Sequence, residues 1–325
     1  MSVSAPRPEF VVFAPPYDPN VGGYIALHYL CHLLNEVGYK AHLIPFFNSA
    51  EISPIDSDSL VTKLLDQRAE IQKSSYTVNA AWNTPIYRRP WRGIAKRDDL
   101  VVVYPEVVFG NPLRAKNVAR WLLHDPGFHN KQVYFVPGEV HFRFLTMHQT
   151  VPMPWIEIAK PFLTVSSLPW EHYQPPLEGS PRSGTAYILR KGRGRPLVHD
   201  LADSIQVDGM SHAQIGEICR KVKTFISYDP RTTYSYLAAL TGVDSVVIPE
   251  EKVTAETWQP DPALRAGVAY GFDDIDRARR TVDVLARRMT QISDDSRGSV
   301  SRFADFWFAR LNPVQSVPRT STCEP

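Results

Sequence analysis

Cysteine is scarce in this sequence, with only Cys31, Cys219 and Cys323 among 325 residues. These three are too few and too far apart for a disulfide framework or a zinc cluster. Such usage is typical of a reducing compartment, so we expect a cytoplasmic protein. An excess of one charge is missing as well, because 36 Lys and Arg stand against 34 Asp and Glu. Dedicated nucleic-acid-binding proteins usually carry a basic excess, so we expect no nucleic-acid partner.

Long apolar runs are also missing. No stretch approaches the roughly 18 apolar residues that a membrane-spanning helix needs, and the N-terminus lacks the basic and apolar regions of a signal peptide. Any membrane contact would therefore be peripheral, at the inner face of the plasma membrane. With 43% hydrophobic and 22% charged residues, the chain has the composition of a folded globular protein. Its length accommodates one large α/β domain or two ordinary ones.

Short apolar runs alternate with amphipathic stretches, which is typical of parallel α/β layers. In the first half we predict strands over 10–15, 41–46, 100–103, 132–136 and 162–165, helices over 24–37, 59–72 and 114–123, and a long loop over 77–96. In the second half we predict strands over 186–189, 204–207, 224–227 and 245–248, and helices over 212–221, 232–240, 275–292 and 300–311. The helix over 114–123 is inferred from Asn111 as its cap and Pro112 in its first turn.

The segment 169–184 is rich in Pro, Gly, Ser and charged residues and poor in aliphatic ones, which is typical of a linker. We therefore predict two Rossmann-like α/β domains, over 1–168 and 185–296, that face each other across a cleft. We expect a helix over 297–312 to return to the first domain and 313–325 to form a tail.

A pair of glycines opens the first predicted helix. Gly22 and Gly23 allow a backbone to approach a ligand closely, and the free N–H groups of a helix N-terminus attract anions. The alternative is a tight strand-to-helix turn without a ligand. The loop is neither a Walker A loop nor a G-x-G-x-x-G dinucleotide fingerprint.

Four cations follow the first strand of the second domain. Arg190, Lys191, Arg193 and Arg195 are interleaved with two glycines, one of them Gly192, and can wrap a phosphate. The carboxyl end of a strand is where open α/β sheets bind ligands, which favours Arg190 and Lys191 in that role. The other interpretation is a solvated basic loop.

A third segment joins a buried strand to a helix. The strand ends at Ser227, Tyr228 and Asp229 turn the chain, and Thr232 and Thr233 open the helix. Hydroxyls and free N–H groups at such a helix start suit a diphosphate. A simple helix cap is the alternative.

The order of these three segments resembles a GT-B glycosyltransferase, a family with two facing Rossmann-like domains that uses nucleotide-activated sugars. The resemblance implies an N-terminal acceptor-side domain and a C-terminal nucleotide-sugar-binding domain. It implies that the donor is bound by Gly22, Gly23, Arg190, Lys191, Gly192, Tyr228, Asp229, Thr232 and Thr233.

The stretch 270–274 before a predicted helix is similar to bacterial enzymes of this family that assemble lipopolysaccharide, O-antigen or capsule. That similarity implies surface polysaccharide synthesis, with a glycan or lipid-linked glycan as acceptor. In one respect the sequence departs from the family, because many retaining members carry two Glu eight positions apart where this chain has Pro230 and Ala238. Asp229 could replace one of them, the donor could be held in another way, or the site could be degenerate.

A transferase that inverts configuration needs a base within about 3 Å of the acceptor hydroxyl. The candidates are Asp18, Glu106, Glu139 and His141, and the two glutamates each follow a predicted strand. Each of these residues could instead be a cap or a structural group. No D-x-D motif is evident, so we expect a nucleotide diphosphate sugar as co-substrate without an obligatory metal or other cofactor.

His28 and His32 lie four positions apart on a predicted helix, yet no third metal ligand is evident near them in the sequence. We therefore interpret the pair as helix-face packing and predict no metal site.

An aromatic and basic patch lies in the loop 77–96. Aromatic faces stack on sugars and arginines bind phosphates or acidic sugars, so we predict an acceptor-binding or membrane-apposed surface made of Trp82, Arg88, Arg89 and Trp91. A loop packed by its own aromatics is the alternative.

Two other functions stay open at this point. One is a catalytically silent binding module of the same fold, which the missing acidic pair favours. The other is an NAD-dependent oxidoreductase, which the missing glycine fingerprint disfavours.

Overall fold

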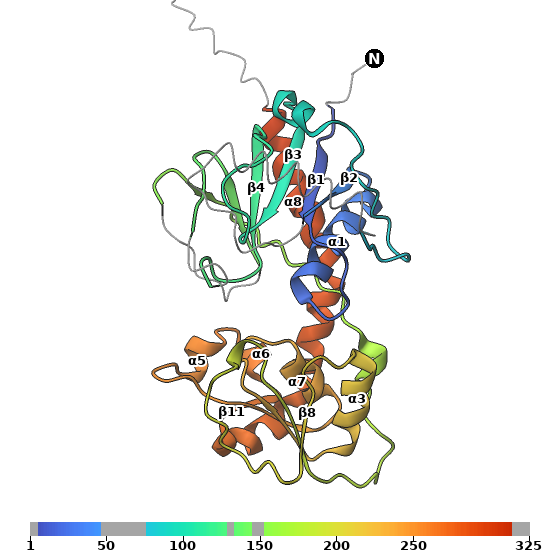
Figure 1. The fold of residues 1–325 in the computed structure, drawn as a ribbon, viewed down its shortest axis with the longest axis vertical. Coiled ribbons are helices and arrows are strands. Elements are labelled where there is room, and N and C mark those ends of the chain that lie inside the picture. Colours follow the sequence, from blue (N-terminus) through green and yellow to red (C-terminus); the bar gives the residue numbers. More distant parts are fainter. Residues whose placement is uncertain (1–5, 47–75, 129–132, 145–152, 314–325) are drawn as a thin grey trace, which may run out of the picture.

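The computed structural model describes residues 6–46, 76–128, 133–144 and 153–313. They form two α/β lobes, each built on a parallel sheet, and the last helix returns from the second lobe to the first (Figure 1). A cavity lies between the two lobes and is lined by both. The predicted fold class, two Rossmann-like domains facing across a cleft in a GT-B-like arrangement, is therefore confirmed.

The N-terminal lobe is built on a six-stranded sheet in which every adjacent pair of strands is parallel. Central strands of such a sheet are covered on both faces and are therefore mainly apolar, as the sequences EFVVFA and LVVVYP show. In sheet order the strands are β2 (Lys40–Pro45), β1 (Glu9–Ala14), β3 (Leu100–Pro105), β4 (Asn117–Leu122), β5 (Val140–Arg143) and β6 (Glu157–Ile158).

Two helices cover one face of this sheet, α1 (Gly22–Glu36) and α8 (Ser296–Leu311). Phe303 of α8 is fully buried, and its ring centroid lies 5.4 Å from that of Phe10 and 4.7 Å from that of Phe142. The other face is covered by the 3-10 helix η1 (Trp91–Lys96) and its neighbouring loops. The last helix of the chain therefore belongs to the core of the first lobe.

The C-terminal lobe has a five-stranded parallel sheet in the order β11-β10-β9-β7-β8. Its strands are β7 (Thr185–Ile188), β8 (Ser204–Gln206), β9 (Thr224–Ser227), β10 (Asp244–Val247) and β11 (Val268–Tyr270). Its helices are α3 (His212–Lys221), α4 (Tyr234–Leu240), α5 (Ala255–Trp258), α6 (Pro262–Arg265) and α7 (Ile275–Asp294), with short 3-10 turns η2 (Trp170–His172), η3 (Arg190–Gly192) and η4 (Phe272–Asp274). Within the described part of the chain, no helix is long and apolar enough to cross a membrane.

The chain passes between the lobes twice, and the two crossings are tied together. Ser299 Oγ donates to the Phe162 carbonyl at 3.0 Å and accepts from the Thr164 N–H at 2.8 Å. Ser296 Oγ accepts from the Ser166 N–H at 3.0 Å. These serines of α8 bond to the segment that leaves the first lobe, so both crossings lie side by side at the junction.

The predicted helix over 114–123 is wrong, because this segment contains strand β4. Asn111 does not cap a helix: its side chain accepts from the Ala115 N–H at 2.9 Å and donates to the Ala115 carbonyl at 2.8 Å, closing a tight loop. Arg114 within that loop has φ 53°, which a helix does not allow. The following residues alternate between the two buried faces of the sheet, so tertiary burial decides their conformation.

Two predicted strands of the first lobe are also wrong. In the described part of 132–136 the chain is a loop, whose Tyr134 carbonyl accepts from the Gly110 N–H at 2.9 Å, and the strand comes later as β5. The segment 162–165 is not a strand, although the Leu163 N–H donates to the Arg143 carbonyl of β5 at 3.0 Å. Its Phe162 carbonyl and Thr164 N–H bond to Ser299 of α8 instead of to a strand. The predicted helix over 59–72 lies outside the described residues, and the one over 232–240 begins two residues later, at Tyr234.

A buried arginine organises the turn that follows β3. Arg120 on β4 is fully buried and donates to the carbonyls of Val108 at 2.6 Å and Gly110 at 2.7 Å. It also pairs with Glu139, with 2.8 Å between Arg120 Nη2 and Glu139 Oε2. The second oxygen of Glu139 lies 2.7 Å from His141 Nε2. Buried charges of this kind are stable only when they are paired and hydrogen-bonded.

We expect Arg120→Met to lower the free energy of unfolding by about 3–5 kcal/mol, because it leaves the Glu139 carboxylate without its cation in the core. Arg302→Met is the matched control, since Arg302 pairs with Asp295 at 2.6 Å on the exposed surface, and we expect it to cost less than about 1 kcal/mol. Urea denaturation measures both. Equal losses in the two variants would contradict this account of the buried pair.

Candidate functional site

The carboxyl ends of strands from both sheets border one cavity of about 450 Å³. Pro15 follows β1, Glu106 follows β3, Leu123 follows β4, Arg190 follows β7 and Asp229 lies two residues beyond β9, and all five line it. In each sheet the order in which successive strands are added reverses at one point. This point lies between β1 and β3 in the first sheet and between β7 and β9 in the second. Ligands of open α/β sheets bind at such reversal points. Here the two reversal points face each other.

The N-terminus of α1 opens onto this cavity. Gly22 and Gly23 are its first two residues, and both line the cavity. The first N–H groups of a helix have no partner within the helix, and Val21 at the cap supplies no side-chain hydrogen bond. A Cβ at Gly22 would meet nothing within 4 Å, so the helix start leaves room for a ligand against its backbone. Together with the helix dipole, this arrangement attracts an anion.

Arg190 and Lys191 lie across the cavity from α1 and also line it. Arg190 adopts φ 42°, the left-handed conformation that is uncommon for a side-chain-bearing residue. Asp208 holds this conformation by accepting from the Leu189 and Arg190 N–H groups, each at 2.8 Å. The strained turn directs the Arg190 guanidinium toward the first lobe, where it lies 3.4 Å from the Asn20 carbonyl oxygen.

Lys191 points toward the first lobe as well. Its ammonium nitrogen lies 5.4 Å from the ring centroid of Phe128. Desolvation in the cleft lowers the pKa of Lys191 and the neighbouring cation Arg190 acts in the same direction, whereas Asp229 and Glu106 oppose the change. Lys191 therefore lies among both cations and carboxylates of the cavity, with its side chain still exposed to solvent.

Gly192 and Tyr228 support this turn without reaching the cavity themselves. A Cβ on Gly192 would overlap the Tyr228 carbonyl, so only glycine lets η3 pack against β9. The Tyr228 side chain is fully buried, and its hydroxyl accepts from the Val198 N–H at 2.8 Å and lies 2.7 Å from His199 Nδ1. Neither residue lines the cavity. Both therefore hold the basic turn in place.

The third predicted segment does border the cavity. Asp229, Thr232 and Thr233 all line it, as does Arg231. Asp229 Oδ1 accepts from the Arg231 N–H at 3.0 Å and so fixes the turn before α4. Arg231 reaches across to the first lobe, with 3.1 Å between its Nη2 and Asp125 Oδ2.

Glu106 is the carboxylate of the first lobe that lines this cavity. Its Oε2 accepts from the Leu123 N–H at 3.0 Å. Withdrawal from water raises the pKa of Glu106 to about 7, although the Leu123 amide and the cation Lys191 oppose the rise. A carboxyl group with such a pKa exchanges protons near neutral pH, as a general base requires.

The other candidate bases lie elsewhere. Glu139 and His141 are buried against each other and against Arg120, and none of the three lines the cavity. Asp18 borders an adjoining cavity of about 250 Å³ that shares Asn20, Arg190 and Tyr234 with the first. Its Oδ1 accepts from the Asn20 N–H at 2.8 Å.

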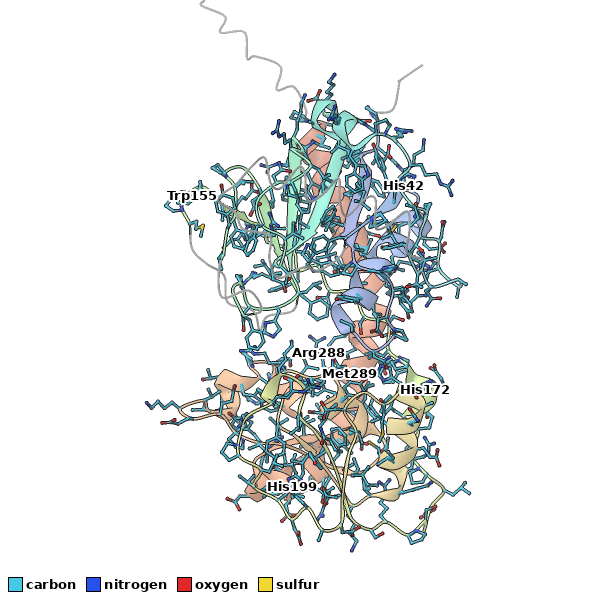
Figure 2. The ribbon with its side chains drawn as sticks, viewed as in Figure 1. His42, Trp155, His172, His199, Arg288 and Met289 are labelled. Atoms are coloured by element: carbon cyan, nitrogen blue, oxygen red, sulfur yellow. The ribbon has the colours of Figure 1, made fainter. Side chains whose placement is uncertain are left out.

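The residues predicted to bind an acceptor are not brought together. Trp82 packs beside α1, with its ring centroid 4.9 Å from Tyr29. Trp91 packs against the opposite face of the sheet. Arg89 lies 3.7 Å from Glu9 at the amino end of β1, where His42 also contacts Glu9, far above the junction of the lobes in Figure 2. None of these residues, nor the exposed Arg88, lines the cavity.

Of the remaining predicted residues, Arg195 and His28 have structural partners. Arg195 donates to the carbonyls of Tyr228 at 2.7 Å and Pro249 at 2.5 Å, whereas Arg193 is exposed. His28 lies 2.8 Å from the Pro15 carbonyl. Among the described residues, no group of three or more His, Cys, Asp or Glu side chains could hold a metal ion.

Sequence inspection missed several residues that border the site. Arg231 and His212 line the cavity, and His212 Nε2 lies 3.1 Å from the Pro19 carbonyl of the opposite lobe. In the first lobe, Asp125 pairs with Arg231, and the Asn20 carbonyl accepts from the Arg190 guanidinium. The position of Arg231, next to the predicted helix start, was a signal for its role, but no sequence signal pairs a residue of one lobe with a residue of the other.

We expect the wild type to lose stability relative to Glu106→Gln as the pH rises from about 5 to about 8. The folded state holds the Glu106 proton more tightly than the unfolded chain, whose carboxyl pKa is the ordinary one, so protonation favours folding. The stability that this proton contributes is complete at low pH and is lost as the pH passes about 7. Urea denaturation across this range measures the difference. Glu250→Gln, on an exposed carboxylate, is the control, and a pH-independent difference for Glu106→Gln would contradict the raised pKa.

No protein-family model and no curated protein matches this sequence. Among solved structures, the chain is similar to the spinosyn forosaminyltransferase SpnP, with 12% identity and a TM-score of 0.42 over 93% of this chain and 99% of that one. It is also similar to the glycotransferase of kitacinnamycin, with 11% identity and a TM-score of 0.43 over 95% and 100%. It is similar as well to MurG of Acinetobacter baumannii, with 10% identity and a TM-score of 0.35 over 92% of this chain and 99% of that one.

Proposed function

We propose that this protein is a glycosyltransferase that moves a sugar from a nucleotide diphosphate donor to an acceptor hydroxyl. The observation that carries the proposal is the meeting of three cations and one helix N-terminus at a single cavity, which is also lined by a carboxylate with a raised pKa. The cations are Arg190, Lys191 and Arg231, and the helix is α1, which begins at Gly22. Fixed cations and backbone N–H groups of this kind stabilise a diphosphate and the charge that develops as it departs.

In the proposed reaction the acceptor oxygen forms a bond to the anomeric carbon while the bond from that carbon to the diphosphate oxygen breaks. Glu106 accepts the acceptor hydroxyl proton, and the diphosphate leaves with the bonding electrons into the field of Arg190, Lys191 and Arg231. Three side-chain cations supply the positive charge that other transferases take from a metal ion, so we propose that the reaction needs no metal. Of the candidate bases, Glu106 is preferred to Asp18 and Glu139 because it lines the main cavity.

The finer expectations stay part of the proposal. We propose a cytoplasmic enzyme of surface polysaccharide synthesis, of the lipopolysaccharide, O-antigen or capsule type, as the resemblance around 270–274 implies. Its acceptor would be a glycan or a lipid-linked glycan, met by peripheral contact with the inner face of the membrane. The second candidate function is a catalytically silent nucleotide-binding module, which Pro230 and Ala238 favour because they replace the acidic pair of many relatives.

We expect uridine, guanosine or thymidine diphosphate to raise the melting temperature, and Arg190→Ala or Lys191→Ala to weaken the binding about 10- to 100-fold. Each variant removes charged hydrogen bonds to the phosphates. Arg193→Ala is the matched control, since Arg193 belongs to the same loop, is exposed and does not line the cavity. Thermal shift and calorimetric titration provide the measurements. Stabilisation by NAD alone, or an equal loss with Arg193→Ala, would overturn the diphosphate site.

We expect Glu106→Gln to keep diphosphate binding and to lower the rate of sugar transfer by about 10²- to 10⁴-fold, because the amide cannot accept the acceptor proton. The rate of transfer or hydrolysis of nucleotide sugars is measured from the amount of nucleoside diphosphate released. Glu250→Gln, on the exposed surface, should retain the full rate. Diphosphate binding with no turnover of any nucleotide sugar in the wild type would favour the silent module instead.

A further inference from the structure

The turn that carries Glu106 is held by a buried arginine of the adjacent strand β4. Arg120 donates from Nη1 to the Val108 carbonyl at 2.6 Å and from Nη2 to the Gly110 carbonyl at 2.7 Å. The same Nη1 lies 3.4 Å from the carbonyl oxygen of Pro105. These three carbonyls lie on both sides of Glu106 in the sequence, so one guanidinium fixes the backbone before and after this carboxylate.

The guanidinium of Arg120 is itself held by two aromatic rings and a carboxylate. Its carbon lies 5.2 Å from the ring centroid of Tyr104 and 5.4 Å from that of Phe135. Its Nη2 lies 2.8 Å from Glu139 Oε2, and the other oxygen of Glu139 lies 2.7 Å from His141 Nε2. A planar guanidinium directs its N–H groups along fixed lines, so an arginine held in this way keeps several acceptors in one geometry.

Glu139 is ionised in this cluster. Burial acts to raise the pKa of Glu139, but the hydrogen bond with His141 and the charge of Arg120 outweigh burial, and this pKa is lowered. A carboxylate with a lowered pKa is a poor base at neutral pH, and Glu139 does not line the cavity. It is suited instead to balance the charge of Arg120 within the lobe.

The protonation of Glu106 depends on where its turn holds it. Withdrawal from water raises the pKa of Glu106 to about 7, whereas the backbone N–H groups of Glu106, Leu123 and His124 and the cation Lys191 oppose the rise. Other charged or histidine side chains among the described lining residues are those of His124, Arg190, His212, Asp229 and Arg231. Because withdrawal from water has the largest effect, a loosened turn would hydrate the carboxyl group and lower its pKa toward the ordinary value.

We propose that Arg120 and Glu139 are a positioning pair for Glu106, in which Glu139 fixes the guanidinium and the guanidinium fixes the turn. Neither residue lines the cavity, so both act through the backbone of the turn. The effect on the reaction rests on the proposed function, because it requires Glu106 to accept the acceptor proton. A misplacement of about 1 Å in such a group costs about 10²-fold in rate.

Arg120→Lys in the full chain separates positioning from charge. The lysine keeps a cation for Glu139, but a single ammonium group cannot also hold carbonyls at both ends of the turn. We expect the pKa of Glu106, followed by ¹³C NMR of labelled glutamate and assigned with Glu106→Gln, to fall from about 7 toward the ordinary value. We also expect the release of diphosphate from uridine, guanosine or thymidine diphosphate glucose to slow about 10- to 100-fold, while the affinity for uridine diphosphate stays unchanged.

Arg182→Lys is the matched control. Arg182 of the second lobe also donates to three backbone carbonyls, those of Cys219, Val222 and Thr241. This variant removes the same kind of forked contact away from Glu106, so the pKa of Glu106 and the rate should not change. Glu139→Gln keeps the shape of the side chain and removes the charge that fixes Arg120. It replaces Arg120→Lys, with the same expected results, if Arg120→Lys fails to unfold cooperatively.

The outcomes separate the positioning pair from the proposed function. A lowered pKa of Glu106 in Arg120→Lys, with no change in Arg182→Lys, supports the pair. An unchanged pKa of Glu106, or equal changes in the two variants, overturns it whatever happens to the rate. A lowered pKa with an unchanged rate, or in a protein that releases diphosphate from no nucleotide sugar, overturns the role of Glu106 as a base, while the positioning of its carboxyl group stands.

Discussion

The gathering of three cations from one lobe at a cavity shared by both lobes is the feature on which the proposed chemistry depends. Arg190, Lys191 and Arg231 all border the same space, where Asp229 and Glu106 are the carboxylates among the described lining residues. The protein stabilises this arrangement locally, by fixing the strained Arg190 backbone on Asp208 and by pairing Arg231 with Asp125. A bound polyanion would be attracted by all three cations. The helix dipole of α1, which starts at Gly22 on the opposite wall, adds to the same attraction.

The fold brings these charges together through its topology. In a parallel sheet all carboxyl ends lie on one edge, and each of the two sheets contributes the edge at which its chain reverses direction. The two crossings then hold the edges face to face, since Ser296 and Ser299 of α8 bond to the segment that leaves the first lobe. Buried residues of the same junction, such as Met289, also line the cavity.

Much of the second lobe could be predicted from sequence, because its strands and helices are bounded by local signals. The helix over His212–Lys221 has a capping box between Ser211 and Gln214, and its predicted bounds are those of the structure. The first lobe was harder, since Asn111 and Pro112 imitate a helix start while the burial of β4 on both faces overrides them. Arg190 and Lys191 could be singled out because basic residues followed a strand. The division of Trp82 and Trp91 between opposite faces could not, since it depends on how a loop wraps around the sheet.

The central claim is that a diphosphate lies between the two lobes, and a crystal structure with bound uridine diphosphate tests it most directly. The account predicts phosphate oxygens within about 3 Å of the Arg190 or Lys191 side chain and of the N–H groups that begin α1. It also predicts that the ligand touches residues of both lobes. A diphosphate bound outside the cavity, or at the Arg89 and Glu9 cluster on the far edge of the first sheet, would contradict it.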